Sequence, residues 1–170
     1  TTIKAIGIDT FGCQSEKEIH VIEIQDAPDL TITGVTKACK GDIVQLTASS
    51  SKSETISWEN REEANGPRQI ALNKVGTITF KAEITVNGCT TTKEHKIEVY
   101  DVPSVEITSV NGKNYVCEGN SLDLKANTSS TDISTIKWNI SSSKTYEATI
   151  TPTSSPTTCS VTITNKAGCS

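Results

Sequence analysis

The sequence predicts an all-β protein made of β-sandwich modules in tandem. Short runs of alternating apolar and polar residues, rich in Val, Ile and Thr, are separated by turn residues, as expected of half-buried strands. No stretch has a sustained apolar repeat at helical spacing. A single tryptophan recurs in each repeat, at Trp58 and Trp138, which is typical of a core residue buried between two sheets.

An internal repeat of 75 to 80 residues predicts where the modules begin and end. Four markers share this period: Gly12-Cys13 with Gly88-Cys89 and Gly168-Cys169, Cys39-Lys40-Gly41-Asp42 with Cys117-Glu118-Gly119-Asn120, Trp58 with Trp138, and Asp26-Ala27-Pro28 with Asp101-Val102-Pro103. They predict the C-terminal part of one module at 1–27, a complete module at 28–102, and a module lacking its last strand at 103–170. Both ends of the chain fall inside a module, so we expect a segment of a longer protein.

The complete module is predicted to contain short strands joined by three recognisable turns. The turns are expected at Gly41-Asp42, at Asn65-Gly66-Pro67 and at Asn87-Gly88, and the last pair favours a type I′ hairpin. The expected strands cover residues 30–33, 43–48, 56–58, 77–86 and 96–99. A module of this size has a small core, so disulfide cross-links would add to its stability.

The order of these markers resembles the tandem immunoglobulin-like and PKD-like modules of large Bacteroidetes cell-surface proteins. The shared pattern is Cys-x-Gly-[Asp/Asn], a Leu-x-Ala strand, a Trp, and a Thr-rich strand that ends in Gly-Cys. It is carried by Cys39, Gly41, Asp42, Leu46, Ala48, Trp58 and Gly88-Cys89, and again by Cys117, Gly119, Asn120, Leu124, Ala126, Trp138 and Gly168-Cys169. The resemblance implies tandem immunoglobulin-like β-sandwich domains.

The same resemblance implies a role outside the cell. The family includes adhesins for attachment and gliding motility that are exported by type IX secretion, and its modules serve as stalk units. We therefore expect a secreted cell-surface segment whose partners are neighbouring immunoglobulin-like modules of the same long chain. A surface glycan or protein is a further candidate partner.

The cysteines allow two pairing schemes, and a third alternative is mixed pairing or free thiols. Six cysteines without a CxxC motif suggest an oxidising compartment. Pairing within modules gives Cys39–Cys89 and Cys117–Cys169, and it leaves Cys13 and Cys159 without partners in this chain. If the resemblance gives the right topology, however, Cys39 and Cys89 lie at opposite ends of one sandwich, too far apart for a disulfide. The second scheme pairs Cys39 with Cys169 across a module junction and Cys117 with Cys159, while Cys13 and Cys89 pair with modules outside this sequence.

Composition and motifs argue against several function classes. A net charge of −4 gives no basic face for nucleic acid, and no apolar run is long enough for a spanning helix, so no membrane insertion is expected. Neither GxSxG nor HExxH occurs, and His20 and His95 occupy equivalent strand positions. Glu62-Glu63 is interpreted as a solvated loop. We therefore predict no enzyme activity, no catalytic residues and no cofactor.

Some alternatives stay open at this point. Asp26, Asp29 and Asp101 lie at module junctions, where calcium is bound in some tandem proteins, although too few acids are present to predict a metal site. Trp58 and Trp138 would stack on sugars only if exposed. Besides a structural stalk that extends an adhesive tip, the chain suits a glycan- or protein-binding module, which exposed aromatic residues near Tyr115, Tyr146 or 61–69 would favour. It also suits an accessory domain of a large secreted enzyme.

Overall fold

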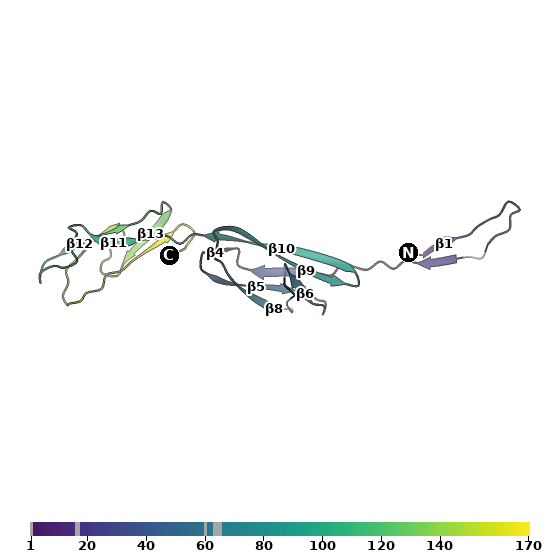
Figure 1. Cartoon of the computed structure of the whole chain (residues 1–170), viewed down its shortest axis with the longest axis horizontal. Helices are drawn as coiled ribbons and strands as arrows, with labels where there is room; N and C mark the ends of the chain where they lie inside the picture. The colour runs from purple at the N-terminus through teal and green to yellow at the C-terminus, as the bar shows by residue number, and fades with distance from the viewer. Residues whose placement is uncertain (1, 16–17, 60, 63–65) are drawn as a thin grey trace. The chain divides into compact units, whose positions relative to one another are not determined.

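A computed structural model describes residues 2–15, 18–59, 61–62 and 66–170 of the chain (Figure 1). The predicted all-β class is confirmed, because the described residues form strands, turns and irregular segments and contain no helix. The strands are β1 (Thr2–Ala5), β2 (Glu18–Val21), β3 (Thr31–Gly34), β4 (Lys37–Cys39), β5 (Ile43–Ser49), β6 (Ile56–Trp58), β7 (Arg61–Glu62), β8 (Gly66–Ala71), β9 (Gly76–Val86), β10 (Cys89–Tyr100), β11 (Glu106–Ser109), β12 (Leu122–Asn127), β13 (Ile133–Trp138), β14 (Glu147–Ile150) and β15 (Val161–Asn165).

The chain divides into two compact units. The first contains 1–33, 47–67 and 80–95, and the second contains 34–46, 68–79 and 96–170. The predicted module limits at 27 and 102 follow the sequence repeat rather than this division, and they stay a prediction.

The first unit contains the N-terminal hairpin and part of a larger set of strands. Strands β1 and β2 pair antiparallel, with Thr2 opposite Val21. Strand β6 pairs antiparallel with β9, so that Trp58 lies opposite Ala82 and Ile56 opposite Ile84. All four of these side chains are buried, which is the result expected of strands that turn alternate residues into a core.

The turn between β9 and β10 has the predicted hairpin geometry. Both Asn87 and Gly88 have positive φ angles, of 49° and 82°, as a type I′ turn requires. In the turn predicted at Asn65-Gly66-Pro67, Gly66 and Pro67 are the first residues of β8. Residue 65 lies outside the described residues.

The second unit includes a pair of sheets that share one core. One sheet has the order β11-β12-β14 and the other pairs β13 with β15. Strand β12 alternates strictly between buried and exposed residues, because its apolar side chains point inward and its polar side chains outward. The shared core contains Leu122, Leu124, Ala126, Ile136, Trp138, Ala148, Ile150 and Ile163. A core supplied by two sheets has the arrangement of a β-sandwich.

Two further sheets are a three-stranded sheet ordered β3-β5-β8 and a five-stranded sheet ordered β4-β10-β9-β6-β7. In the second of these, β10 lies between β4 and β9, and it runs parallel to β4 with Cys39 opposite Tyr100. Strands β4, β7 and β8 were not predicted from the sequence. The Lys37–Cys39 and Arg61–Glu62 runs have too few residues to show a period, and β8 begins within the predicted Asn65-Gly66-Pro67 turn.

Candidate functional site

A disulfide bond joins Cys39 to Cys169 within the second unit. The two cysteines are 130 positions apart in the chain, and their Cα atoms are 5.7 Å apart. The bond is the one that the second pairing scheme requires between two modules. It excludes Cys39–Cys89 and Cys117–Cys169, because each of those pairs uses one of the bonded cysteines.

The Cys39 side of the bond is held by a tight turn and by β10. The backbone N–H of Cys39 donates to the Asp42 carboxylate at 2.8 Å, and the Asp42 N–H donates to the Cys39 carbonyl at 3.0 Å. Next to the cysteine, the Lys40 N–H donates to the Tyr100 carbonyl at 2.8 Å. The Cys-x-Gly-Asp marker therefore fixes the direction from which this cysteine reaches its partner.

The Cys169 side of the bond is organised by Asn165. This residue is 5% exposed and its side chain makes three hydrogen bonds. Its Oδ1 accepts the backbone N–H groups of Ala167 and Cys169 at 3.0 and 2.9 Å. Its Nδ2 donates to the carbonyl of Asp101 at 2.9 Å. Asn165 thus closes the turn that carries Cys169 and ties it to residue 101.

The segment at Asp101 is where the predicted second module passes into the third. The Asp101 carbonyl accepts the hydrogen bond from Asn165, and the Asp101 carboxylate lies 3.8 Å from the Lys40 Nζ. Both of these side chains are largely exposed, so the ion pair contributes little on its own. The disulfide, the Asn165 amide and the Lys40–Asp101 pair together connect three segments of the second unit, namely 39–42, 101 and 165–169.

Sequence reasoning missed Asn165. Trp58 lies opposite Ala82 and Trp138 lies opposite Val161. When the two repeats are aligned on these pairs, Asn165 takes the position of Val86. An amide at a strand position that is aliphatic in the other repeat indicates a polar group that needs partners.

We predict that Asn165→Ala weakens this connection. The change leaves two N–H donors and one carbonyl without their partners, and each such group costs about 1–3 kcal/mol where water cannot replace the bond. The free energy of unfolding of the second unit should fall by roughly 2 kcal/mol, and Cys39–Cys169 should be reduced faster by dithiothreitol. Asn139→Ala is a matched control, since Asn139 is exposed. An unchanged reduction rate for Asn165→Ala would contradict this role.

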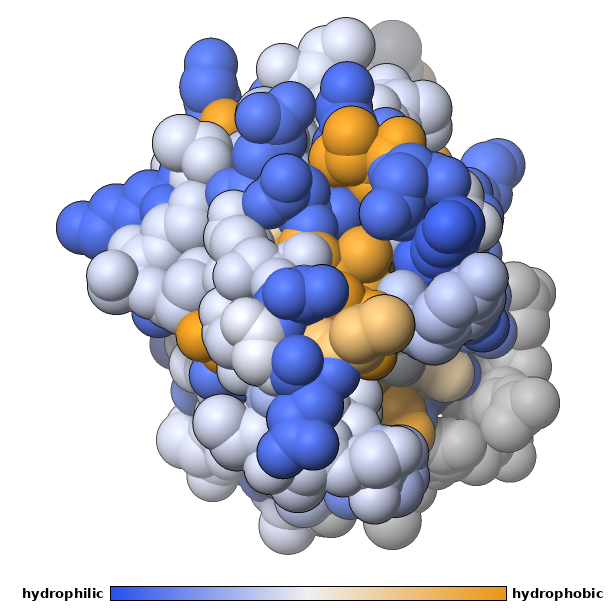
Figure 2. All heavy atoms as spheres, turned by 90° about the vertical axis from the view of Figure 1, so that its left-hand side faces the viewer, coloured by the Kyte–Doolittle hydropathy of each residue, from blue (hydrophilic) through white to orange (hydrophobic). Residues whose placement is uncertain are grey.

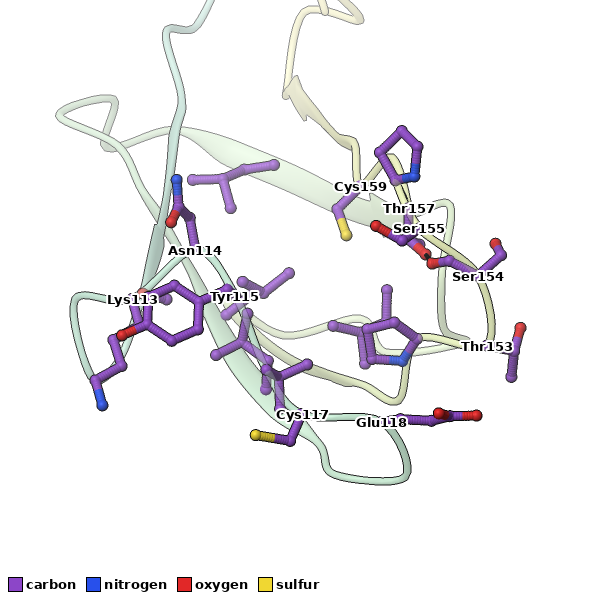
Figure 3. Close-up of a pocket in the computed structure, with 18 residues that line it drawn as sticks. Lys113, Asn114, Tyr115, Cys117, Glu118, Thr153, Ser154, Ser155, Thr157 and Cys159 are labelled. Atoms are coloured by element: carbon purple, nitrogen blue, oxygen red, sulfur yellow. Dashed lines mark hydrogen bonds between the residues drawn. The ribbon is translucent and has the colours of Figure 1, made fainter.

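The Cys117–Cys159 bond of the second pairing scheme is not formed. Cys117 is exposed and Cys159 is half-buried, and both line one cavity of the second unit. Figure 3 shows them on opposite sides of that cavity, with the Cys117 sulfur directed away from Cys159. Cys159 instead packs at the edge of the core as a small apolar side chain. Cys13 and Cys89 are also unbonded.

Both tryptophans are buried side chains. Trp58 is 3% exposed and Trp138 is 6% exposed. The Trp138 indole N–H donates to the carbonyl of Thr145 at 3.0 Å, which satisfies its one polar group. Neither ring is therefore available to stack on a sugar.

The remaining polar candidates do not come together. Among the residues that the structure describes, no three His, Cys, Asp or Glu side chains are placed to hold a metal ion. His20 is exposed, His95 is half-buried, and Glu63 lies outside the described residues. Asp29 instead accepts hydrogen bonds from the loop that follows β5, from the Ser51 hydroxyl at 2.6 Å and the Ser51 N–H at 3.0 Å.

We predict that Asp29 titrates below the usual range of an aspartate. The Ser51 hydroxyl and then the Ser51 N–H bond the charged form, so the pKa of Asp29 lies below its usual value of 3.8. Its contribution to stability is complete above the unfolded-state pKa and is lost as the pH falls through the lower folded-state pKa. Carboxyl NMR should show that Ser51→Ala raises this pKa, whereas Ser53→Ala in the same loop leaves it unchanged. Equal effects of the two variants would exclude the assignment.

No helix of the described residues has the length and apolar character needed to cross a membrane. In comparisons with known proteins, no family model matches this chain and no curated protein matches its sequence.

Proposed function

We propose that this chain is a structural segment of a bacterial cell-surface adhesin, in which modules are linked end to end by disulfide bonds. The observation that carries the proposal is the Cys39–Cys169 bond, which joins the Cys-x-Gly turn of one sequence repeat to the Gly-Cys turn of the next. Junctions between modules otherwise allow large relative motion. A covalent bond at the junction limits that motion, and such a bond persists in an oxidising compartment outside the cytoplasm.

The same bond can recur at further junctions. Cys117 is the repeat equivalent of Cys39, and Cys13 and Cys89 are the equivalents of Cys169. All three are unbonded in this chain. On this proposal Cys117 bonds to the Gly-Cys turn of another module, rather than to Cys159, and Cys13 and Cys89 bond to Cys-x-Gly turns. The partners are therefore neighbouring immunoglobulin-like modules, and no enzymatic reaction is assigned to the chain.

The resemblance to gliding and attachment adhesins supports the stalk over a binding module. The two buried tryptophans offer no stacking surface, and the exposed Tyr115 and Tyr146 line different cavities. An aromatic platform for a glycan would require such residues on one face. A glycan array probed with the chain should therefore give no specific signal.

Pulling on single molecules tests the mechanical role. When force is applied between the two ends, the bond keeps residues 40–168 out of the extended path. Reduction should lengthen the fully extended chain by about 450 Å, because roughly 130 residues become available at up to about 3.5 Å each. The Cys39→Ser/Cys169→Ser double variant should give the long form without reductant, and Cys117→Ser should not. If the oxidised chain already extends fully, the proposed mechanical role is wrong.

A further inference from the structure

A cavity of the second unit lies between its two free cysteines, Cys117 and Cys159. Its volume is about 730 Å³. Residues 113–118 line one side and residues 152–157 and 159 line another, with apolar side chains between them, including those of Ile107, Leu122, Leu124 and Ile150. Figure 3 shows Tyr115 and Cys159 bordering the cavity. In Figure 2 the left-hand side of Figure 1 faces the viewer, and hydrophobic residues (orange) lie at the centre of a mostly hydrophilic surface.

The repeat shows what occupies the corresponding position elsewhere in the chain. Lys37–Cys39 form β4, and their repeat equivalents are Tyr115, Val116 and Cys117. Strand β4 is paired with the end of β10, whereas residues 115–117 are not part of a strand. The same backbone segment is thus paired in one repeat and unpaired in the other.

The opposite wall of the groove leads to the same strand. Trp58 pairs with Ala82 and Trp138 pairs with Val161, so Cys159 has the register position of Phe80 in β9. Strand β10 is the neighbour of β9, but among the described residues β15 has only β13 as a neighbour. In the other repeat, β10 therefore lies between β4, which is equivalent to residues 115–117, and β9, which contains the equivalent of Cys159.

We infer that this groove binds an extended segment of the β10 type, with aliphatic residues at alternate positions as in Lys96–Tyr100. In β10 the aliphatic side chains of this segment, Ile97 and Val99, are 0% and 2% exposed. The groove offers matching apolar contacts from Val116 and Cys159, which are only half-buried. The added strand runs parallel to 115–117, as β10 runs parallel to β4. This mode of recognition gives affinity through main-chain hydrogen bonds and selectivity through alternate side chains.

The pairing in the other repeat fixes the register. Glu98, Val99 and Tyr100 lie opposite Lys37, Ala38 and Cys39. The corresponding residues of the bound segment therefore lie opposite Tyr115, Val116 and Cys117, and its valine packs beside Val116. This inference does not depend on the proposed stalk, because it rests on strand pairing and not on the disulfide.

A capped peptide with the sequence of residues 93–101 tests the inference on the full oxidised chain. Fluorescence anisotropy should show one peptide bound per chain, and hydrogen exchange should slow at the amides of 115–117 and 161–165. A peptide of equal length and charge with Ile97→Ser and Val99→Ser should bind at least tenfold more weakly. Val116→Asp in the chain should weaken binding as strongly, with the amide spectrum of residues 28–100 unchanged. Equal binding of both peptides, or protection at other sites, would overturn the inference.

A second arm supplies the strand within one chain. A copy of residues 90–101 replaces Ser170 directly after Cys169, so that it follows Cys169 as residues 90–101 follow Cys89. This extended chain should melt at a higher temperature, protect the amides of 115–117, and no longer bind the free peptide. If it binds the peptide as well as the original chain, the groove is not the site. Concentration-dependent dimerisation that protects 115–117 without any peptide would assign the groove to a second copy instead and overturn the inference.

Discussion

Reduction of Cys39–Cys169 is expected to cost the second unit about 5 kcal/mol of unfolding free energy in the chain-entropy description of a disulfide. The size of the effect follows from the separation of 130 residues between the two cysteines, because a cross-link that closes a long loop removes more freedom from the unfolded chain. Urea unfolding of the Cys39→Ala/Cys169→Ala double variant, followed by amide exchange in β12–β15, measures the loss. The double variant is preferable to a single one, since it leaves neither sulfur unpaired.

The two other cysteines of the second unit supply the control. Cys117→Ser replaces an exposed thiol and Cys159→Ala removes a half-buried one. Neither carries a bond, so Cys117→Ser should change stability by less than about 0.5 kcal/mol. If Cys117→Ser and the double variant were equally destabilised, the stabilisation would not come from the Cys39–Cys169 link.

Strands β3, β5, β6, β9 and β10 were predictable from the sequence because local alternation determines them. The runs at 43–48, 56–58, 77–86 and 96–99 all lie within observed strands. Their Val, Ile and Thr residues prefer an extended backbone whatever their distant neighbours are. The Asn87-Gly88 turn was predictable for the same reason, since its positive φ angles suit these two residue types.

The cysteine pairing was only partly predictable, because pairing depends on which chain segments meet in space. The repeat and an assumed topology were enough to place Cys39 near Cys169. They were not enough for Cys117 and Cys159, whose side chains line the same cavity and yet are not bonded. A sulfur can bond only when its Cβ direction also fits, and a residue pattern does not contain that direction.

Replacing the buried tryptophan of the second unit should have an effect of similar size. Trp138→Ala leaves a large space in the core and removes the indole donor from the Thr145 carbonyl. Substitutions of this kind cost about 3–5 kcal/mol. Hydrogen exchange at the amides of β12, β13 and β15 should therefore become several hundredfold faster under native conditions, since every 1.4 kcal/mol is about a factor of ten.

The comparison with Trp138→Phe separates the two causes of this loss. Phenylalanine keeps most of the apolar volume but lacks the indole N–H, so that variant should lose much less stability than the alanine variant. Tyr146→Ala is the surface control, because Tyr146 is 42% exposed. Strong protection in Trp138→Ala, close to that of the unsubstituted chain, would mean that the core shared by the two sheets does not hold them together. The sandwich arrangement, and with it the groove between residues 113–118 and residues 152–159, would then need another physical basis.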